Sequence, residues 1–416
     1  MLPPQPGNSP IRILLLVPQW PDPPMQGAAI RNLQIALYLA QRHSVTLLTF
    51  EAGHAFTETT NLRSICERVE VLPLPTRGSL QRLKTLATST QPDMAWRLRS
   101  DDMWSKVTEV CASERYSHIH VEGIEMATYG LLAAQLMPGA KLTYDAHNAE
   151  ALLQRRAFTT DVKQWRSLPR AMYSLVQWWR LRRFEKQICQ VSRYVLAVSE
   201  ADLEALKKLV VGHTEQMRLL PNGVEPDYWR RGVGYTEPTM SVVASIVFDG
   251  TMDYRPNVDA AVWFAHEVWP LIRQSRRDAC FYIVGRNPSP AVTALEKIEG
   301  VNVIGPVDDP RGWVAGASVY VVPMRMGGGV RLKVLQAMSM ACAIVSTHMG
   351  AEGIDVQDGR EMLLARSPEE FARSALTLLS DGATGRRLGA SARELIKQRY
   401  SWENLLPVLD ELYPPA

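Results

Sequence analysis

The stretch that decides the fold is Pro323-Met-Arg-Met-Gly-Gly-Gly-Val-Arg-Leu-Lys-Val-Leu-Gln-Ala-Met338. It follows residues 317–322, an apolar and largely β-branched segment typical of a buried parallel strand. Three glycines then allow close backbone approach and positive φ angles. The apolar residues that share one face of the predicted helix are Val330, Val334, Leu335 and Met338. A strand, a glycine turn and a helix N-terminus together favour the binding of an anion.

Two cations at the start of this predicted helix strengthen that interpretation. Arg331 and Lys333 fall in the expected first turn, where positive charge opposes the helix dipole. Helix stability does not favour two cations at this place, whereas a bound diphosphate does. The alternative is a solvated basic turn on an ordinary strand–helix unit. We therefore treat a diphosphate site as a hypothesis.

Length and composition exclude several classes of protein. A chain of 416 residues predicts two domains, and its longest apolar runs fall short of the roughly 18–20 residues that span a bilayer. A net charge of +3 is too small to indicate nucleic-acid binding. The five cysteines form no CxxC pair, which indicates neither a zinc site nor a disulfide framework. We expect a protein of the reducing cytoplasm.

Predicted strands and helices alternate along the chain, as in parallel sheets covered on both faces. The strands predicted in the first half are residues 11–17, 45–50, 69–72, 118–121, 142–145 and 195–198. Those predicted in the second half are residues 242–248, 281–284, 301–304, 319–322 and 343–346. Between them, residues 222–223 and 230–238 indicate a turn and a linker. We expect two doubly wound domains facing a central cleft, with ligands at the carboxyl ends of the strands.

The loop after the first predicted strand leads to Gly27 at the start of a predicted helix, so Gly27 would let the backbone approach a ligand. The loop lacks the GxGxxG fingerprint, which argues against a nicotinamide or flavin cofactor. The alternative is a proline-stiffened loop with a capping glycine.

Polar side chains follow another predicted strand in Asp145-Ala-His-Asn-Ala-Glu150. His147 could bond a sugar hydroxyl or transfer a proton, although Asp and Asn also simply cap helices. In the second half, Gly250 would permit close ligand approach, and Asn257 could cap the following helix. Residues 346–353 again combine a strand end with two glycines and a carboxylate.

Taken in order, these motifs resemble a retaining glycosyltransferase of the GT-B fold, in the Gly-x-Arg-Leu-Lys subgroup of family 4. The resemblance runs from about Ile11 to Trp402. The segments that carry it are the loop with Gly27 and Arg31, Asp145-Ala-His-Asn-Ala-Glu150, Val198-Ser-Glu200, Pro221-Asn-Gly-Val224, Gly250-Thr-Met-Asp-Tyr-Arg-Pro-Asn257, Val284-Gly285, Gly329-Val-Arg-Leu-Lys-Val-Leu-Gln-Ala-Met338, Gly350-Ala-Glu-Gly353 and Tyr400-Ser-Trp402.

The resemblance implies an α/β protein with two Rossmann-like domains. Residues 1–225 would bind the acceptor, residues 226–399 would bind the nucleotide sugar, and residues 400–416 would pack back on the first domain. The donor would be a UDP-, GDP- or ADP-linked sugar, and the acceptor a saccharide or a lipid-linked glycan. The family reaction retains anomeric configuration and requires no metal or other cofactor. Such an enzyme would serve cell-surface glycan or exopolysaccharide synthesis.

The resemblance also implies roles for single residues. Arg331 and Lys333 would neutralise the leaving diphosphate together with the helix N-terminus, and His147 would contact the sugar. The further residues implied in binding the nucleotide and its sugar are Gly27, Gly250, Gly285, Arg286, Gly328, Gly329, Val330, Gln336, Ala351, Glu352 and Gly353. The leaving phosphate would help to accept the proton of the acceptor, so that orientation and charge stabilisation carry the rate.

Two positions depart from the family pattern, which has a pair of glutamates where this chain has Gly328 and Gln336. An amide at position 336 accepts a ribose hydroxyl without charge assistance, and this would weaken donor binding by about 1 kcal/mol. Ala28 also replaces a frequent second glycine. Two alternatives therefore stay open: a nucleotide-sugar epimerase or phosphorylase of the same fold, and a catalytically silent partner of another transferase. A phosphorylase would need a pyridoxal-phosphate lysine, and the sequence identifies none.

Residues 155–183 are rich in arginine and tryptophan. The side chains concerned are Trp165, Arg166, Arg170, Trp178, Trp179, Arg180, Arg182 and Arg183. They suit a surface at the inner membrane face beside anionic lipids, and hence a lipid-linked acceptor. They equally suit a helix that buries its tryptophans while its arginines are solvated.

Overall fold

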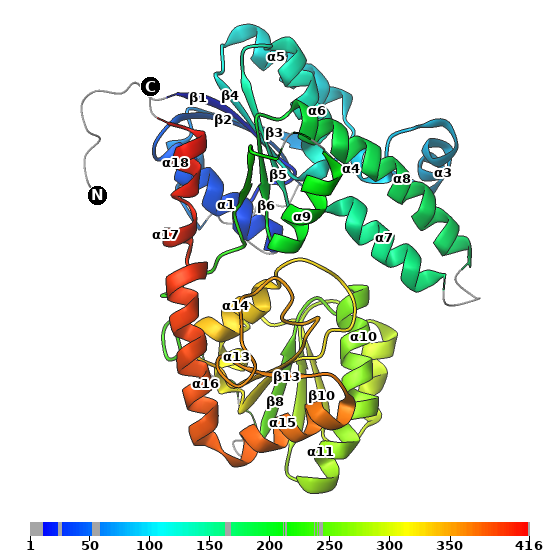
Figure 1. The fold of residues 1–416 in the computed structure, drawn as a ribbon, viewed down its shortest axis with the longest axis vertical. Helices are drawn as coiled ribbons and strands as arrows, with labels where there is room; N and C mark the ends of the chain where they lie inside the picture. Colours follow the sequence, from blue (N-terminus) through cyan, green and yellow to red (C-terminus); the bar gives the residue numbers. More distant parts are fainter. Residues whose placement is uncertain are drawn as a thin grey trace. The chain divides into compact units, whose positions relative to one another are not determined.

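A computed structural model describes residues 11–23, 27–51, 59–162, 168–210, 212, 214–236, 238, 240 and 244–414. The chain forms two compact units, which Figure 1 traces from the N-terminus to the C-terminus. Unit 1 comprises Met1–Pro221 and Leu406–Ala416, and unit 2 comprises Asn222–Leu405. The sequence placed the first boundary after residue 225 and the return to the first domain at about residue 400.

Unit 1 is built on a seven-stranded parallel sheet with the order β3-β2-β1-β4-β5-β6-β7. The strands are β1 (Arg12–Val17), β2 (Ser44–Glu51), β3 (Arg68–Pro73), β4 (His118–Glu122), β5 (Lys141–Ala146), β6 (Tyr194–Ala197) and β7 (Met217–Leu219). The central strand β1 is buried over five consecutive residues because helices cover both faces of the sheet. The strand order reverses between β1 and β4, and ligands bind at such a switch point in open α/β sheets.

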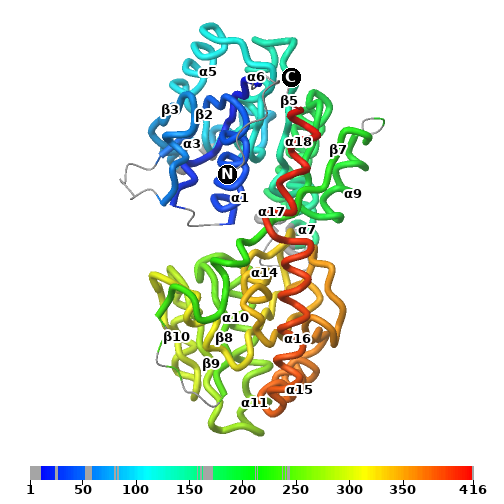
Figure 2. The backbone as a smooth tube through the Cα atoms, turned by 90° about the vertical axis from the view of Figure 1, so that its left-hand side faces the viewer, coloured from blue at the N-terminus to red at the C-terminus, as the bar shows by residue number. Residues whose placement is uncertain are grey.

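The helices of unit 1 are α1 (Gly27–Ala40), α2 (Leu62–Ile65), α3 (Ser79–Thr88), α4 (Asp93–Arg97), α5 (Asp101–Ser113), α6 (Gly123–Leu136), α7 (Glu150–Asp161), α8 (Leu168–Val191), α9 (Glu200–Leu209) and α18 (Val408–Leu412). Ser100 and Ser199 cap α5 and α9 by accepting backbone N–H bonds. The last helix, α18, packs on unit 1, where Tyr38 of α1 donates to Asp410 over 2.8 Å (Figure 2).

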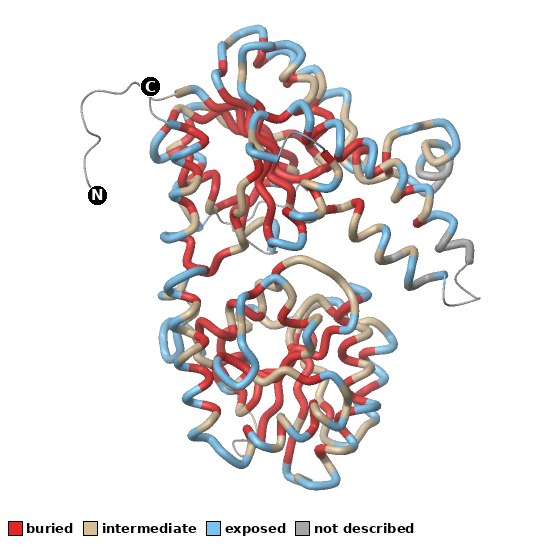
Figure 3. The backbone as a smooth tube through the Cα atoms, viewed as in Figure 1, coloured by how far each residue is buried: buried red, intermediate tan, exposed pale blue. Residues whose placement is uncertain are grey.

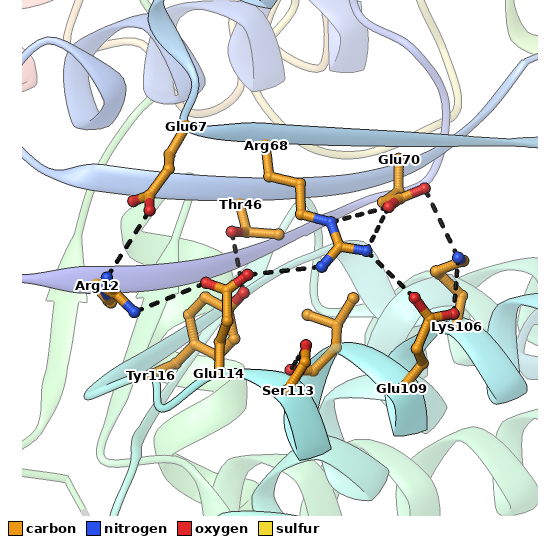
Figure 4. Close-up of polar contacts among 11 residues, drawn as sticks. Arg12, Thr46, Glu67, Arg68, Glu70, Lys106, Glu109, Ser113, Glu114 and Tyr116 are labelled. Atoms are coloured by element: carbon orange, nitrogen blue, oxygen red, sulfur yellow. Dashed lines mark hydrogen bonds and ion pairs between the residues drawn. The ribbon is translucent and has the colours of Figure 1, made fainter.

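A network of ion pairs lies at the amino end of the unit 1 strands (Figure 4). Arg68 at the start of β3 donates to Glu70 over 2.8 Å and pairs with Glu109 of α5 over 3.3 Å. Glu114 joins Arg68 to Arg12 at the start of β1, over 3.5 and 3.8 Å. Exposed pairs contribute little individually, and this network lies at the opposite edge from the carboxyl ends of the strands.

Unit 2 has a six-stranded parallel sheet with the order β10-β9-β8-β11-β12-β13. The strands are β8 (Ser245–Asp249), β9 (Cys280–Val284), β10 (Val301–Gly305), β11 (Val319–Val322), β12 (Ile344–Thr347) and β13 (Leu363–Ala365). Here the order reverses between β8 and β11. Figure 3 shows the buried residues of each unit concentrated along its strands. Two parallel sheets with alternating helices confirm the predicted fold class; the cleft between them stays a prediction.

The helical segments of unit 2 are α10 (Arg255–Trp263), η2 (Phe264–Val268), α11 (Trp269–Ser275), α12 (Pro290–Thr293), η3 (Ala294–Lys297), α13 (Arg311–Gly316), α14 (Leu332–Ser339), α15 (Pro368–Ser380), α16 (Gly382–Leu395), η4 (Ile396–Tyr400) and α17 (Trp402–Leu405). No helix in the described part of the chain combines the length and the apolar character that crossing a bilayer requires.

Three details of the sequence prediction were wrong. The helix after the glycine run begins at Leu332, so Val330 precedes it and Arg331 is its N-cap. Val330 is nevertheless buried, because the loop itself packs on the core of unit 2. The short strands β7 and β13 were not predicted. Strand β8 begins at Ser245, while residues 242–243 of the predicted strand lie outside the described residues.

Candidate functional site

The predicted binding residues of unit 2 lie in loops that follow four neighbouring strands. Gly285 follows β9 and Gly250 follows β8, residues 327–331 follow β11, and residues 350–353 follow β12. In the sheet these strands stand in the order β9-β8-β11-β12. Since the strands are parallel, the four loops share the carboxyl edge, centred on the switch point. The structure thus brings most of the predicted residues to one edge of one sheet.

Two glycines of this edge touch each other. The backbone of Gly285 has φ 144°, and a Cβ atom there would lie only 1.7 Å from the carbonyl oxygen of Gly250. Gly250 has φ 151°, and a Cβ atom there would lie 2.5 Å from Nζ of Lys333. A side chain at either position would therefore displace the backbone or the lysine. Glycine is required at both positions because the loops after β8 and β9 and the side chain of Lys333 approach one another this closely.

Lys333 is held from two sides in the first turn of α14. Its ammonium donates to the carbonyl oxygen of Asp249 and, over 3.1 Å, to Oδ1 of Asn257. It also lies 4.4 Å from the centre of the Phe248 ring. Burial lowers the pKa of Lys333 to about 8, against the opposing charge of Asp249. At neutral pH the amine is charged and fixed in direction.

Asn257 does not cap its helix as predicted. The N-cap of α10 is Tyr254, and the Nδ2 group of Asn257 donates to the carbonyl oxygen of Thr251 over 3.0 Å. Its side chain instead ties the loop after β8 to Lys333. Asn257 therefore helps to hold the ammonium group of Lys333 in place.

Arg331 occupies the N-cap of α14 with extended backbone, φ −88° and ψ 106°. Its guanidinium donates to the carbonyl oxygen of Gly329 over 2.9 Å. Gly327 and Gly329 have φ angles of 109° and 73°, and the half-buried Gly328 lies between them. The guanidinium of Arg331 thus lies against the glycine loop that precedes the first turn of α14, where the helical N–H groups have no partner within the helix.

The other predicted residues of unit 2 line the same edge. Gln336 is half-buried on α14, and the carbonyl oxygen of Arg286 accepts from Met252 over 2.7 Å. After β12, the N–H groups of Ala351 and Glu352 donate within their own turn, to the carbonyl oxygens of Thr347 and Met349 over 3.2 and 3.4 Å. Gly353 ends that turn, exposed and with φ 84°.

In unit 1, the predicted His147 follows β5 and is partly exposed, at 17% for its side chain. Its Nε2 atom lies 2.8 Å from Oε2 of Glu122, which ends β4 and is fully buried. The other oxygen of Glu122 lies 3.0 Å from Nε2 of His120. Nδ1 of His120 in turn lies 2.5 Å from the hydroxyl of Tyr413, just after α18. These four residues form one hydrogen-bonded chain.

Electrostatics inside this chain favour the charged forms of Glu122 and His147. Burial opposes ionisation of Glu122, but hydrogen bonds from His120 and His147 outweigh it and hold the pKa of Glu122 below its usual range. Burial also opposes protonation of His147, but the bond to Glu122 and its charge prevail and raise the pKa of His147. His147 is therefore a cationic donor over a wider pH range than a free histidine.

The remaining predicted residue of unit 1, Gly27, opens α1 in an exposed turn. One turn further along, Arg31 forms a buried bidentate ion pair with Asp145, over 3.0 Å from Nε and 2.9 Å from Nη2. Arg31 also donates to the carbonyl oxygen of Leu220 over 2.9 Å. Helix α1 thus joins the end of β5 to the last residues of unit 1 before the boundary.

Sequence reasoning missed Glu122, His120 and Tyr413. His120 and Glu122 are two apart on β4 and so point to the same face of the sheet. That alternation was a usable signal, because two such side chains at a strand end meet the polar residues of the next strand. No local pattern marks Tyr413.

One group of side chains among the described residues has donor atoms close enough for a metal ion: His120, Glu122 and Asp145, within 4.8 Å of one another. Both oxygens of Asp145 accept from the guanidinium of Arg31, which places a fixed positive charge at this point. A metal ion would have to displace the Arg31 guanidinium in order to bind Asp145. Metal independence stays a prediction.

The arginine- and tryptophan-rich segment falls on α7 and α8, which lie side by side (Figure 1). Trp178 packs partly buried against the core of unit 1, whereas Trp179 is 52% exposed beneath the Arg183 guanidinium, 4.8 Å from the ring centre. Met172, 62% exposed, extends the apolar face. Trp178 thus follows the interpretation of a packed tryptophan, and contact of α8 with a membrane stays a prediction; residues 163–167 lie outside the described residues.

Two family models match the chain. Residues 25–228 match glycosyltransferase family 4, and residues 244–381 match the glycosyl transferases of group 1. Each unit thus contains a segment that is similar to a glycosyltransferase family. Among curated proteins, this chain is 23% identical over 164 residues to an uncharacterized 44.6 kDa protein in the cps region of Klebsiella pneumoniae. It is 32% identical over 93 residues to an uncharacterized glycosyltransferase of Methanocaldococcus jannaschii.

The matched segments cover 38% and 22% of this chain, and 42% and 24% of the length of those two relatives. Solved structures match over nearly the whole chain. HepE of Anabaena in complex with UDP is 14% identical with a TM-score of 0.67, covering 97% of this chain and 99% of HepE. Sucrose-phosphate synthase of Thermosynechococcus elongatus is 17% identical with a TM-score of 0.68, covering 97% and 98%. At these identities the likeness establishes the GT-B fold alone.

Proposed function

We propose that this chain transfers a sugar from a nucleoside-diphosphate sugar to an acceptor hydroxyl, with retention of configuration. The observation that carries the proposal is the placement of Lys333 and Arg331 at the start of α14, beside the switch point of the unit 2 sheet. Lys333 donates to the backbone carbonyl oxygen of Asp249 and to the side-chain amide oxygen of Asn257. Both acceptor groups are neutral, so the charge of Lys333 remains available to an anion. Two cations and a helix N-terminus suit a diphosphate.

In this proposal, charge stabilisation and orientation carry the chemistry. As the bond between sugar and diphosphate breaks, negative charge grows on the leaving phosphate, where the ammonium and the guanidinium stabilise it. The same cations would supply what a metal ion provides in other transferases. The acceptor hydroxyl attacks from the side of the leaving group, and a leaving phosphate oxygen helps to accept its proton. His147 would hold a sugar hydroxyl, which fixes the orientation of the reactants.

The relatives support a choice of substrates to test first. HepE of Anabaena is solved with UDP and with UDP-glucose, so uridine nucleotides come before GDP and ADP. A relative in a cps region, and structural similarity to WaaG, a glycosyltransferase involved in lipopolysaccharide biosynthesis, support an acceptor from surface polysaccharide synthesis. The exposed Trp179 and Met172 on α8, beside Arg183, support contact with the inner membrane face and a lipid-linked acceptor.

Calorimetry with UDP, GDP and ADP tests the diphosphate site. Arg331→Ala and Lys333→Ala should each weaken binding by about 1.5–3 kcal/mol, since each removes a charge-assisted hydrogen bond. Arg276→Ala is the matched control, because this arginine of unit 2 pairs with the exposed Asp278 over 2.9 Å. Unchanged affinity in both folded site variants would place the diphosphate elsewhere.

Product analysis then separates the transferase from its alternatives. With a bound donor and a panel of acceptors, a transferase yields a glycoside and a free nucleoside diphosphate. An epimerase converts the sugar without any acceptor, and a silent partner binds nucleotide without turnover. Nuclear magnetic resonance of the anomeric proton of the glycoside reports retention or inversion directly.

A further inference from the structure

The fully buried carboxylate of Glu122 lies between two histidines, and each of its oxygens is bonded to one of them. Oε1 lies 3.0 Å from Nε2 of His120, and Oε2 lies 2.8 Å from Nε2 of His147. Asn32 of α1 completes the group when its amide nitrogen faces inward, because it then donates to Oε2 of Glu122 and to the carbonyl oxygen of Ala28, each over 3.0 Å. The same nitrogen lies 3.1 Å from Nε2 of His147, a contact that is no hydrogen bond while Nε2 carries its proton. A carboxylate accepts only, so both histidines donate to it through Nε2.

The hydrogen positions follow along the whole chain. Since Nε2 of His120 carries a proton, a neutral His120 presents a lone pair at Nδ1, and the hydroxyl of Tyr413 donates to it over 2.5 Å. Burial raises the pKa of Tyr413, so the phenol keeps the proton that this bond requires. The ring of Tyr413 also lies against His118, with centres 5.3 Å apart. The C-terminal segment thereby fixes the orientation of His120, and His120 fixes Glu122.

The other side of His147 is kept open. Gly123, with φ 75°, has its Cα beside the imidazole, and a Cβ atom there would lie 3.3 Å from Nδ1 of His147. Among the described residues, no hydrogen bond is made to Nδ1 of His147, and the side chain is 17% exposed. The atom that meets solvent or a ligand is therefore Nδ1.

We propose that Glu122 is the positioning residue of His147: it holds Nε2–H and leaves Nδ1 as the only ring atom that exchanges a proton or binds a ligand hydroxyl. Glu122 touches no substrate itself. It acts through the orientation, the tautomer and the charge of His147, because the hydrogen bond at one ring nitrogen of a histidine determines the protonation of the other. The inference about activity rests on the proposed function, whereas the inference about tautomer and charge does not.

Other charges also face His147. Asp145 at the end of β5 favours its protonated form, and Arg31 of α1 opposes it. Glu150 at the start of α7 also interacts with its charge. Arg31 and Asp145 neutralise each other in a bidentate pair, so Glu122, which makes the direct bond, is the partner whose removal should change the titration most.

Imidazole nitrogen resonances of the full-length protein test the proposal. His147 is assigned with His147→Gln; above its pKa it should show a protonated Nε2 and a bare Nδ1. In Glu122→Gln, the pKa of His147 should fall by about one unit or more, since an opposite charge in contact is lost. Glu122→Asp keeps the charge and should restore part of the shift. Glu185→Gln, which replaces another buried carboxyl group, bonded to the N–H groups of Glu150 and Ala151, is the control and should shift the His147 titration less than Glu122→Gln does.

Transfer kinetics provide the second readout. Glu122→Gln should lower kcat about tenfold or more, leave the affinity for nucleoside diphosphate unchanged, and move the acidic limb of the pH profile with the pKa of His147. A protonated Nδ1 in the neutral wild-type histidine would overturn the proposal without any variant. A His147 pKa unchanged in folded Glu122→Gln would overturn it as well. Confirmed resonances without any transferase activity would instead refute the proposed function.

Discussion

Arg31 and Asp145, 114 residues apart in the sequence, form a bidentate ion pair whose side chains are 1% and 0% exposed. The same guanidinium donates to the carbonyl oxygens of Leu220 and Pro221, over 2.9 and 3.3 Å, and Pro221 is the last residue of unit 1 before the boundary. One side chain therefore joins α1, the end of β5 and the exit of the chain from unit 1. Removing it leaves three acceptors without their donor.

We predict that Arg31→Ala lowers the free energy of unfolding by about 3–5 kcal/mol, because it leaves the Asp145 carboxylate buried and unpaired. The double variant Arg31→Met/Asp145→Leu should lose less than Arg31→Ala alone, since apolar side chains can replace a buried pair. Urea denaturation measures both. Arg68→Ala, in the exposed network of Figure 4, is the control and should cost about 1 kcal/mol or less. A loss for Arg31→Ala as small as for the control would contradict the role of the pair.

Gly285→Ala tests the contact between the loops after β8 and β9. The new Cβ would lie 1.7 Å from the carbonyl oxygen of Gly250, at a φ angle of 144°. We predict a loss of about 4 kcal/mol or more in stability, measured by thermal and urea unfolding. Gly359→Ala isolates backbone strain, because φ is 76° there but nothing lies within 4 Å of the new atom; we expect about 1–2 kcal/mol. Equal losses in the two variants would mean that the loops relax apart.

The sequence predicted the sheets because their strands are long, apolar and separated by glycine or proline. It failed where the pattern is short or where packing decides. Strands β7 and β13 have three residues each, too few for a periodicity. Val330 is apolar and close to the helix, which predicted a place in the first turn. The positive φ angles of Gly327 and Gly329 and the extended backbone of Arg331 instead delay the start of the helix to Leu332.

The residues of the candidate site also fall into those that the sequence predicts and those that it does not. The loops of unit 2 were predictable because each follows its own strand and carries a glycine or a cation. The partners of His147 were not, since Tyr413 lies 293 residues from His120 and no local rule joins them. The support of Lys333 by Asn257 was missed because an asparagine near a helix start is usually a cap, and only the approach of α14 gives it another role.

The affinity for nucleoside diphosphate should depend on pH through Lys333. Its pKa is lowered to about 8 by burial, so the ammonium is present below that pH and is lost as pH rises through it. Because the anion binds the charged form, we expect affinity to fall about tenfold from pH 7 to pH 9, with proton uptake on binding near pH 8. Lys333→Arg keeps its charge and should flatten the profile. An unchanged profile in Lys333→Arg would assign the titration to another group.

Metal removal should leave transfer intact. Arg331 and Lys333 would supply the positive charge at the diphosphate, and Arg31 occupies the oxygens of Asp145 in the one group of described side chains that is arranged for a metal ion. We expect kcat and KM to be unchanged after dialysis against EDTA. Complete loss of activity, restored by Mn²⁺ or Mg²⁺, would require a metal site and would overturn this assignment.

Gln336 is the position where an acidic residue is expected from the family pattern, and it is half-buried on α14, one turn from Lys333. If its side chain faces the ribose, Gln336→Glu should keep the fold, because the two side chains are nearly isosteric, and should tighten donor binding by about 1 kcal/mol through a charge-assisted acceptor. Calorimetry with the nucleotide sugar measures the change. Gln398→Glu, on an exposed face of unit 2, controls for the added negative charge.

A marked loss of affinity in Gln336→Glu would show that the amide N–H of Gln336 donates, for example to a phosphate oxygen, and that this chain binds its nucleotide differently from its relatives. An unchanged affinity would place Gln336 outside the site, and the main argument for a silent partner would then disappear with it.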